Sequence, residues 1–305
     1  MANVREIRRR IKSVKNIGQV TRALEAVSAS KVRKAQAQVL ASRPYAQHAW
    51  EVLVNVAAQG GGVPLHPLLE VRPNPRNITI LLISGDRGLA GAYNTGVLRV
   101  ALEFANRLCQ EECTIRWVAV GRKGCDALLR ARQHVVAEFS NLPADPTIQS
   151  VGPIARTVID DFLTRAADQV FIAYTDFINT LAQRPVVRNL LPLSQFDGGN
   201  QAVRDLIKVG PTVTTQGREY LYEPSPTAIL EEVLPRFTAL QIYQAILEGL
   251  ASEHSARMIA MRNASKNAEA LAADLQLTYN KARQLAITSE ILDIVGGVEA
   301  LRGQR

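Results

Sequence analysis

Near its end the chain contains a run of helical sequence that is too long for an ordinary globular helix. Between Pro235 and Gly296 there is one glycine, Gly249, and no proline. At 1.5 Å per residue this run would extend roughly 90 Å as an α-helix. Side chains of a coiled-coil seam recur along it, at Phe237, Leu240, Leu247, Leu250, His254, Met258, Met261, Ala268, Leu271, Leu275, Ala282 and Leu285. A periodic pattern of this length predicts a coiled-coil helix.

A second long helix is predicted at the start of the chain. Apolar residues follow one another there at steps of four and three, at Ile7, Ile11, Val14, Ile17, Val20, Leu24 and Val27, and the pattern continues through Val32, Ala35 and Val39. We expect a bend at Pro44, a resumed helix over 45–58, and an end at the glycines 60–62. Helices at opposite ends of a chain can pair only if the segment between them brings the chain back to the point where it left the first helix. The predicted pair is therefore antiparallel.

The middle of the chain has a different texture, in which short β-rich runs alternate with helical stretches. The expected strands are Asn77–Ser84, Thr114–Val120, Gln169–Tyr174 and Pro185–Leu191, and the expected helices include Ala92–Gln110 and Gly152–Ala167. This alternation indicates βαβ units. We therefore predict an α/β fold with long helices: an antiparallel coiled coil of the N- and C-terminal helices, and an inserted Rossmann-like domain with a mostly parallel sheet. The expected segments are a coiled-coil helix over 1–60, the α/β domain over 73–211, and a helix over 224–305 that pairs with the first.

The apolar end of the last helix lacks a predicted partner within the chain, because the first helix is shorter. This end has the sequence QLAITSEILDIVGGVEAL, and it contains Leu285, Ile287, Ile291, Leu292, Ile294, Val295, Val298 and Leu301. An exposed apolar surface of this size marks an interaction site. We expect another protein to enclose it.

The net charge of +8 is concentrated in the first helix. Residues 1–43 hold eleven Lys or Arg against the two acids Glu6 and Glu25, and the remainder of the chain is nearly neutral. A basic helix can face nucleic acid, a membrane surface or an acidic protein. This segment has no aromatic residue to stack on bases, and its apolar face is the predicted seam. The pattern favours an acidic protein partner, with a coiled-coil nucleic-acid binder as the alternative.

Motifs of catalysis are missing from the sequence. It has no Walker A sequence, GxGxxG, HExxH or paired CxxC, and its four histidines are far apart. The nearest approach is SGDRGLAG at Ser84–Gly91, which follows a predicted strand; its spacing favours a tight β-to-α turn over a phosphate site. We expect no catalytic residue, cofactor or metal site. An enzyme built on the βαβ domain is the third hypothesis.

Neither a membrane span nor a secretion signal is expected. No apolar run approaches the roughly 18 residues that a spanning helix needs, and the basic start MANVREIRRRIK is not followed by an apolar segment. The three cysteines, Cys109, Cys113 and Cys125, are an odd number, which is typical of a reducing compartment.

Both ends of the chain resemble one family. EIRRRIKSVKNIGQVTRALEAVSASKVRKAQ and ASRPYA are similar to the opening of F-type ATP synthase γ subunits, and ASEHSARMIAMRNASKNAEALAADLQLTYNKARQLAITSEILDIVGGVEAL is similar to their ending. LLISGDRGLAGAYN, FINTLAQRPVVRNLLPL and YLYEPSPTAIL resemble family blocks in the same order. The resemblance covers nearly the whole chain.

The resemblance implies a non-catalytic rotor of the proton-transporting ATP synthase. Its coiled coil would lie inside the ring of α and β subunits, and its foot would bind the ε subunit and the membrane c-ring, with δ present in the complete complex. Torque from the c-ring would then drive the catalytic sites on β. The implied location is the cytoplasmic side of a bacterial cell membrane, which the chain would contact only through the c-ring. The resemblance implies no nucleic-acid partner.

The resemblance also implies coupling contacts to α and β. In TRALEAV these are Arg22 and Leu24, Lys31 follows on the basic face, and SARMIAMRNAS supplies Arg257. In ITSEILDIV the matching polar residues are Thr288, Ser289, Glu290 and Asp293. The apolar bearing tip comprises Ile291, Leu292, Val295, Val298 and Leu301. Two departures from the family are Gly296-Gly297-Val298, expected to loosen the helix near the tip, and a long polar loop over 195–217.

Overall fold

The computed structural model describes residues 4–58, 66–108, 113–193 and 225–302. The chain divides into two compact units. We call Met1–Ser28 together with Met258–Arg305 the shaft unit, and Ala29–Arg257 the domain unit. Two long helices, α1 (Val4–Ala58) and α6 (Pro226–Arg302), each contribute to both units. The loop over 195–217 lies outside the described residues.

Both long helices contain a proline that the sequence analysis treated as a boundary or a bend. α1 continues through Pro44 to Ala58, and α6 begins nine residues before Pro235. The start of α6 follows from capping, since the Ser225 hydroxyl accepts a hydrogen bond from the amide of Ala228 at 3.2 Å. Pro226 occupies the first helical position, where a missing N–H costs nothing. A long helix can absorb the hydrogen bond that an interior proline removes.

In the shaft unit, α1 and α6 pair in antiparallel fashion. A Cβ atom on Gly18 would lie 3.4 Å from Cβ of Ala268, and the hydroxyls of Thr21 and Ser265 are 2.7 Å apart. Position along α1 therefore rises as position along α6 falls. The predicted antiparallel coiled coil is confirmed.

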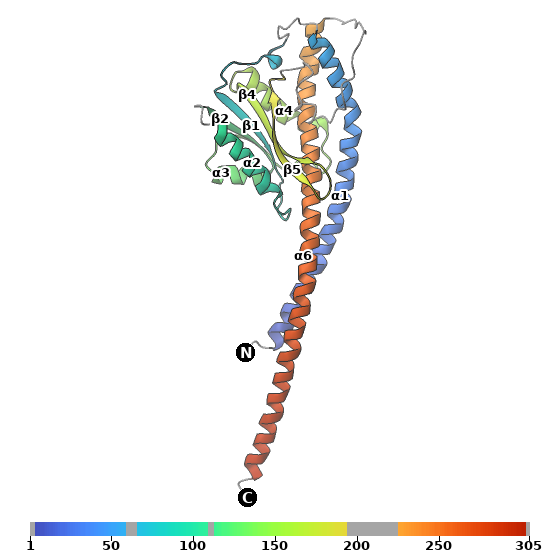
Figure 1. Cartoon of the computed structure of the whole chain (residues 1–305), viewed down its shortest axis with the longest axis vertical. Coiled ribbons are helices and arrows are strands. Elements are labelled where there is room, and N and C mark those ends of the chain that lie inside the picture. Colours follow the sequence, from blue (N-terminus) through green and yellow to red (C-terminus); the bar gives the residue numbers. More distant parts are fainter. Residues whose placement is uncertain (1–3, 59–65, 109–112, 194–224, 303–305) are drawn as a thin grey trace. The chain divides into compact units, whose positions relative to one another are not determined.

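The domain unit contains a five-stranded sheet in the order β3-β2-β1-β4-β5 (Figure 1). The strands are β1 (Asn77–Ile83), β2 (Thr114–Val120), β3 (Val135–Phe139), β4 (Gln169–Phe177) and β5 (Gln183–Leu191). β1 pairs in parallel with β2 and β4, β2 pairs in parallel with β3, and β5 is antiparallel to β4. The mostly parallel sheet is confirmed.

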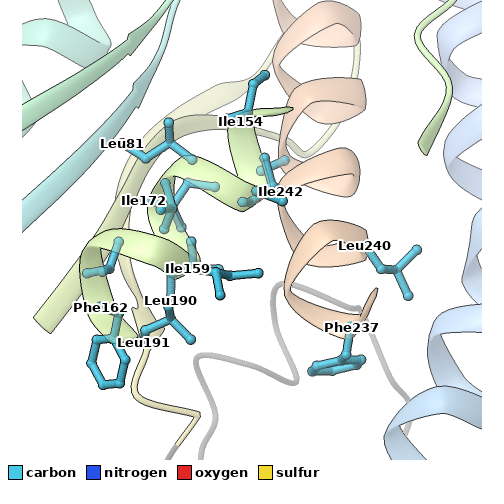
Figure 2. Packing of buried hydrophobic residues seen from close by; sticks show 14 of the residues in the cluster. Leu81, Ile154, Ile159, Phe162, Ile172, Leu190, Leu191, Phe237, Leu240 and Ile242 are labelled. Atoms are coloured by element: carbon cyan, nitrogen blue, oxygen red, sulfur yellow. The ribbon is translucent and has the colours of Figure 1, made fainter. Parts of the chain in front are cut away.

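Helices cover both faces of this sheet. α2 (Tyr93–Leu108) and α3 (Arg122–Arg130) share a hydrophobic cluster with one face. α4 (Ile148–Leu163) and α6 share a larger cluster with the other face, and a short 3₁₀ helix, η1 (Pro67–Leu69), joins it. Figure 2 shows Leu81 and Ile172 of the sheet close to Ile154 of α4 and Ile242 of α6. The long helix α6 is thus part of the core of the α/β domain.

Three elements of the domain unit were missed by the sequence analysis, namely the 3₁₀ helix η1, α3 and β3. α3 has only nine residues, and β3 is a five-residue strand at the edge of the sheet with no fully buried position. α3 is shorter than the roughly 11 to 18 residues over which a helical period is read, and the partly exposed β3 gives no clear alternation, which explains why they were not predicted.

Candidate functional site

The seam of the shaft unit changes along α1 from large apolar residues to small and polar ones. On α1 it runs through Ile7, Ile11, Val14, Gly18, Thr21, Glu25 and Ser28, at alternating steps of four and three. This spacing is the heptad repeat of a coiled coil. The predicted stripe is wrong at Ile17, Val20 and Val27, which are 53%, 58% and 54% exposed. Its later members Val32 and Ala35 are buried, as expected. A Cβ atom on Gly18 would make ordinary contact with Cβ of Ala268, so only a small residue fits here without displacing α6.

Ion pairs lie along the edges of this seam. Arg22 pairs with Glu269, and Arg262 donates from Nε to Glu25 at 2.8 Å. Arg22, a predicted coupling residue, remains mostly exposed and borders a groove of about 450 Å³ between the two helices. Leu24 lies half-buried on the same stretch of α1. Exposed ion pairs contribute little stability, so Arg22 can exchange Glu269 for another acidic partner at low cost.

Beyond the seam, α6 has no partner among the described residues of the shaft unit. Extending the register by fourteen residues from Gly18 and Ala268 puts Val4 opposite Ala282. Every residue from Arg283 to Gly296 is exposed. This segment, which we call the bare end of α6, includes Thr288, Ser289, Glu290, Asp293, Ile291, Leu292 and Val295.

The helix itself continues to Arg302, so the expected loosening at Gly296-Gly297-Val298 is wrong. The backbone hydrogen bonds of a helix this long outweigh the propensity cost of two glycines, which is about 1 kcal/mol each. The side chains of Val298 and Leu301 lie outside the described residues.

In the domain unit, one face of α6 packs against the turn that follows β1. A Cβ atom on Gly249 would lie 3.2 Å from Cγ2 of Ile83 and from Oη of Tyr93, so this glycine permits a close crossing of α6 over the end of β1. One helical turn later, Glu253 faces Gly85. A Cβ atom on Gly85 would lie 2.8, 2.9 and 3.0 Å from the three carboxyl atoms of Glu253.

Arg257 follows one further turn along the same face of α6. Its Nη2 donates to Oε1 of Glu253 at 2.5 Å and to the carbonyl oxygen of Gly88 at 3.1 Å. The side chains of Arg257 and Glu253 are only 13% and 10% exposed. Arg257, predicted as a contact to β, is therefore engaged inside its own domain in this structure.

Electrostatic effects at this face are consistent with a tightly packed charge pair. Burial and the charge of Glu253 raise the pKa of Tyr93 well above its usual value. Burial, followed by the charges of Arg257 and Lys31, lowers the pKa of His254 to about 4. Nη1 of Arg257 lies 3.2 Å from Nδ1 of His254, and because a guanidinium only donates, Nδ1 accepts. Lys31, another predicted coupling residue, is exposed beside this group.

The turn Ser84–Gly91 is tied to the sheet by its own polar groups. Asp86 accepts hydrogen bonds from the amides of Arg122 and Asn141 at 3.1 and 3.0 Å. Gly91 has a φ of 56°, as expected for a tight turn, whereas Gly85 has no positive φ and is small for a different reason: it leaves room for Glu253. Glu253 was missed by the sequence analysis, because nothing in its spacing links it to a turn 168 residues earlier.

The predicted coupling residues do not gather at one point. Arg22, Leu24 and the residues of the bare end belong to the shaft unit, while Lys31 and Arg257 belong to the domain unit. Their roles as contacts stay a prediction. Among the described residues, no three His, Cys, Asp or Glu side chains lie close enough to hold a metal ion. None of the described helices is both long and apolar enough to cross a membrane.

Comparison with known proteins finds similarity over the whole chain. The family model described as ATP synthase matches residues 3–301. An ATP synthase gamma chain of Roseiflexus castenholzii is 44% identical over 301 residues, which cover 99% of each chain. An ATP synthase gamma chain of Dehalococcoides mccartyi strain BAV1 is 47% identical over 305 residues, which cover 99% of this chain and 100% of the relative.

Solved structures support the same fold. A chain in the mitochondrial ATP synthase of Euglena gracilis matches with a TM-score of 0.62 and 20% identity, covering 98% of this chain and 94% of the other. A chain in the central stalk and c-ring structure of Tetrahymena thermophila mitochondrial ATP synthase matches with a TM-score of 0.59 and 23% identity, covering 81% and 99%.

Fold and surfaces together define a class of protein: an antiparallel coiled coil that carries an inserted α/β domain and presents a bare helical end. The sequence matches make the assignment specific. The chain belongs to the ATP synthase γ chain family, as its two ends and its internal blocks indicated. Neither comparison gives any support to the nucleic-acid alternative.

Proposed function

We propose that this chain is the central-stalk rotor subunit of an F-type, proton-transporting ATP synthase, and that it transmits torque without catalysing a reaction itself. The observation that carries this proposal is the bare end of α6. Its exposed apolar side chains include Ile287, Ile291, Leu292, Ile294 and Val295. Exposed apolar side chains gathered on one helical segment mark a surface that another protein covers. A ring of α and β subunits provides such an enclosure.

The polar residues of the bare end fit the same role. Thr288, Ser289, Glu290 and Asp293 are exposed between the apolar side chains. A surrounding protein that contacts both the polar and the apolar side chains would make different contacts at each rotational position of α6. The three catalytic sites on β would therefore meet different surfaces as the shaft turns. Arg22, Leu24, Lys31 and Arg257 are proposed as further contacts to α and β.

The remaining partners are proposed from the family. The foot of the chain binds the ε subunit and the membrane c-ring, and δ completes the assembly. The chain is peripheral, on the cytoplasmic side of a bacterial cell membrane, and it reaches the membrane only through the c-ring. Proton flow through the c-ring turns the chain and so drives ATP synthesis.

Co-expression with α and β tests this proposal. We expect the purified chain alone to hydrolyse no ATP, and the complex of α and β to turn over ATP several-fold faster with the chain than without it. A chain truncated before Arg283 is the informative variant, because it keeps the paired seam and loses only the bare end. ATP hydrolysis by the purified chain, or equal turnover of the complex with and without it, would contradict the proposal.

A further inference from the structure

The order of the strands places a topological switch point at the end of β1, where sheets of this type usually bind ligands. From β1 the chain proceeds through β2 to β3 on one side, and β4 then lies on the other side of β1. In open α/β sheets, ligands bind at such a switch point, outside the carboxyl ends of the strands. The turn Ser84–Gly91 leaves β1 at this place.

In this chain α6 occupies that position. Gly249, Glu253 and Arg257 are spaced by four residues and therefore lie on one face of α6. Gly249 allows the approach to Ile83 and Tyr93, the carboxylate of Glu253 fills the space at Gly85, and Arg257 bonds to the carbonyl oxygen of Gly88. We call Gly85, Gly88, Glu253 and Arg257 the α6 latch.

We propose that Glu253 is a positioning residue that locks α6 to the α/β domain through the α6 latch, so that torque passes between them without slip. The proposal rests on the rotor function. Apolar contacts between a helix and a sheet resist separation, but they are not directional and permit small sliding movements. The ion pair of Glu253 and Arg257 lies within α6 and holds the guanidinium in place. The bond from this guanidinium to the carbonyl oxygen of Gly88 then fixes the axial position and the rotation of the helix against the domain.

Other contacts of α6 in the domain unit reinforce the fixation. Oγ of Ser252 donates to the carbonyl oxygen of Thr175 on β4 at 3.1 Å, in a buried environment. From Phe237 to Arg257 the helix has no exposed residue. The latch therefore adds directional bonds to a segment that is already enclosed, and it does so at the end of β1.

The first experiment measures coupling in the assembled, membrane-bound enzyme. We expect E253Q to retain ATP hydrolysis and to lower the ratio of protons pumped to ATP hydrolysed at least threefold. R257Q should do the same, and the double variant should be no worse than the poorer single variant, because both changes break one latch. The matched control is E232Q, which removes the exposed ion pair of Glu232 with Arg236 on the same helix and should leave the ratio unchanged.

The second experiment uses the full-length chain alone, and it does not depend on rotation. We expect E253Q to raise the amide hydrogen exchange of residues 249–257 at least tenfold, whereas E232Q should not change it. G85A provides an independent test, since its methyl group must displace the carboxylate of Glu253. In an E253A background, which leaves space for that methyl group, G85A should have no further effect on exchange.

These measurements separate the failure of the latch from the failure of the rotor function. If the wild-type enzyme couples hydrolysis to pumping while E253Q couples equally well, the latch is overturned and the rotor function stands. Unchanged exchange over 249–257 in both E253Q and G85A overturns the latch as well. If the wild-type complex does not couple ATP hydrolysis to proton pumping at all, the rotor function fails. Raised exchange in E253Q would then show that the latch only stabilises the fold, which contradicts the positioning role.

Discussion

The bare end of α6 leads to a quantitative prediction about assembly. We consider the substitution of Ile291, Leu292, Ile294 and Val295 together by serine. These side chains are 55–67% exposed, so somewhat more than half of each surface remains to be buried by a partner. Full burial of an aliphatic side chain contributes about 1.5–3 kcal/mol. Each substitution should therefore weaken association by about 1 kcal/mol, and the four together by about 4 kcal/mol, or roughly 10³-fold in Kd.

The assay is a titration of the α and β complex with the chain, with ATP turnover as the signal. The quadruple variant should shift the half-saturating concentration by about three orders of magnitude. It should also remain monomeric at higher concentration than the wild type, because less apolar surface is exposed. A misfolded variant would instead associate at lower concentration than the wild type. Serine has nearly the same helix propensity as isoleucine and valine, so α6 should stay intact.

A matched control tests whether the weaker association depends on where the apolar residues lie or only on the loss of apolar surface. Leu181 is 80% exposed in the domain unit, and L181S removes one exposed apolar side chain away from the bare end, as each of the four substitutions does within it. It should leave the half-saturating concentration unchanged. A quadruple variant that saturates at the wild-type concentration, or an L181S variant that is equally impaired, would refute the reasoning.

Three further predictions concern the fold. Gly121 has a φ of 93°, and a Cβ atom there would lie 2.2 Å from the carbonyl oxygen of Ser84. G121A should therefore lower the free energy of unfolding in urea by at least about 3 kcal/mol, whereas a loss below about 1 kcal/mol would show that this turn relaxes easily. G18A should stabilise the chain by up to about 1 kcal/mol, because a Cβ atom at Gly18 makes ordinary contact with Ala268. G18L should instead lower the thermal midpoint of unfolding, and equal midpoints for the two variants would contradict the close crossing. His254 has a folded-state pKa lowered to about 4, so the folded chain binds fewer protons than the unfolded chain between that pH and about 6.5. Stability linked to His254 should thus be complete above pH 6.5 and decline as the pH falls toward 4, and H254Q should flatten this part of the urea-midpoint profile; an unchanged slope would show that His254 is not the group responsible.

Much of the fold could be predicted because long or buried elements give strong patterns. The limits of β2 agree with those expected, and α6 was recognised from its length and its periodic apolar stripe. The seam of the shaft unit could not be followed beyond Val14. Apolar residues at Ile17 and Val20 suggested one stripe, but close approach of the helices selects Gly18 and Thr21, which have no hydrophobic signal.

The candidate surfaces could be predicted only in part. Exposure of the bare end followed from comparing the lengths of two helices, which is a property of the sequence. The α6 latch did not follow, because Glu253 meets Gly85 only after the sheet and the crossing at Gly249 have formed. Arg257 was identified as a contact from its motif, but its partners in the folded chain, Glu253 and Gly88, depend on that tertiary arrangement.

The surface of α6 changes along its sequence in a way that fits transmission of force. From Phe237 to Arg257 the helix has no exposed residue, Ser252 and Arg257 bond to the domain that encloses it, and Glu253 pairs with Arg257. From Arg283 to Gly296 it is exposed on every side. A helix held by many directional contacts at one end cannot slip there, while a helix with no internal partner at the other end is available to a foreign surface. The enclosed segment and the bare end belong to the same helix, since α6 runs from Pro226 to Arg302.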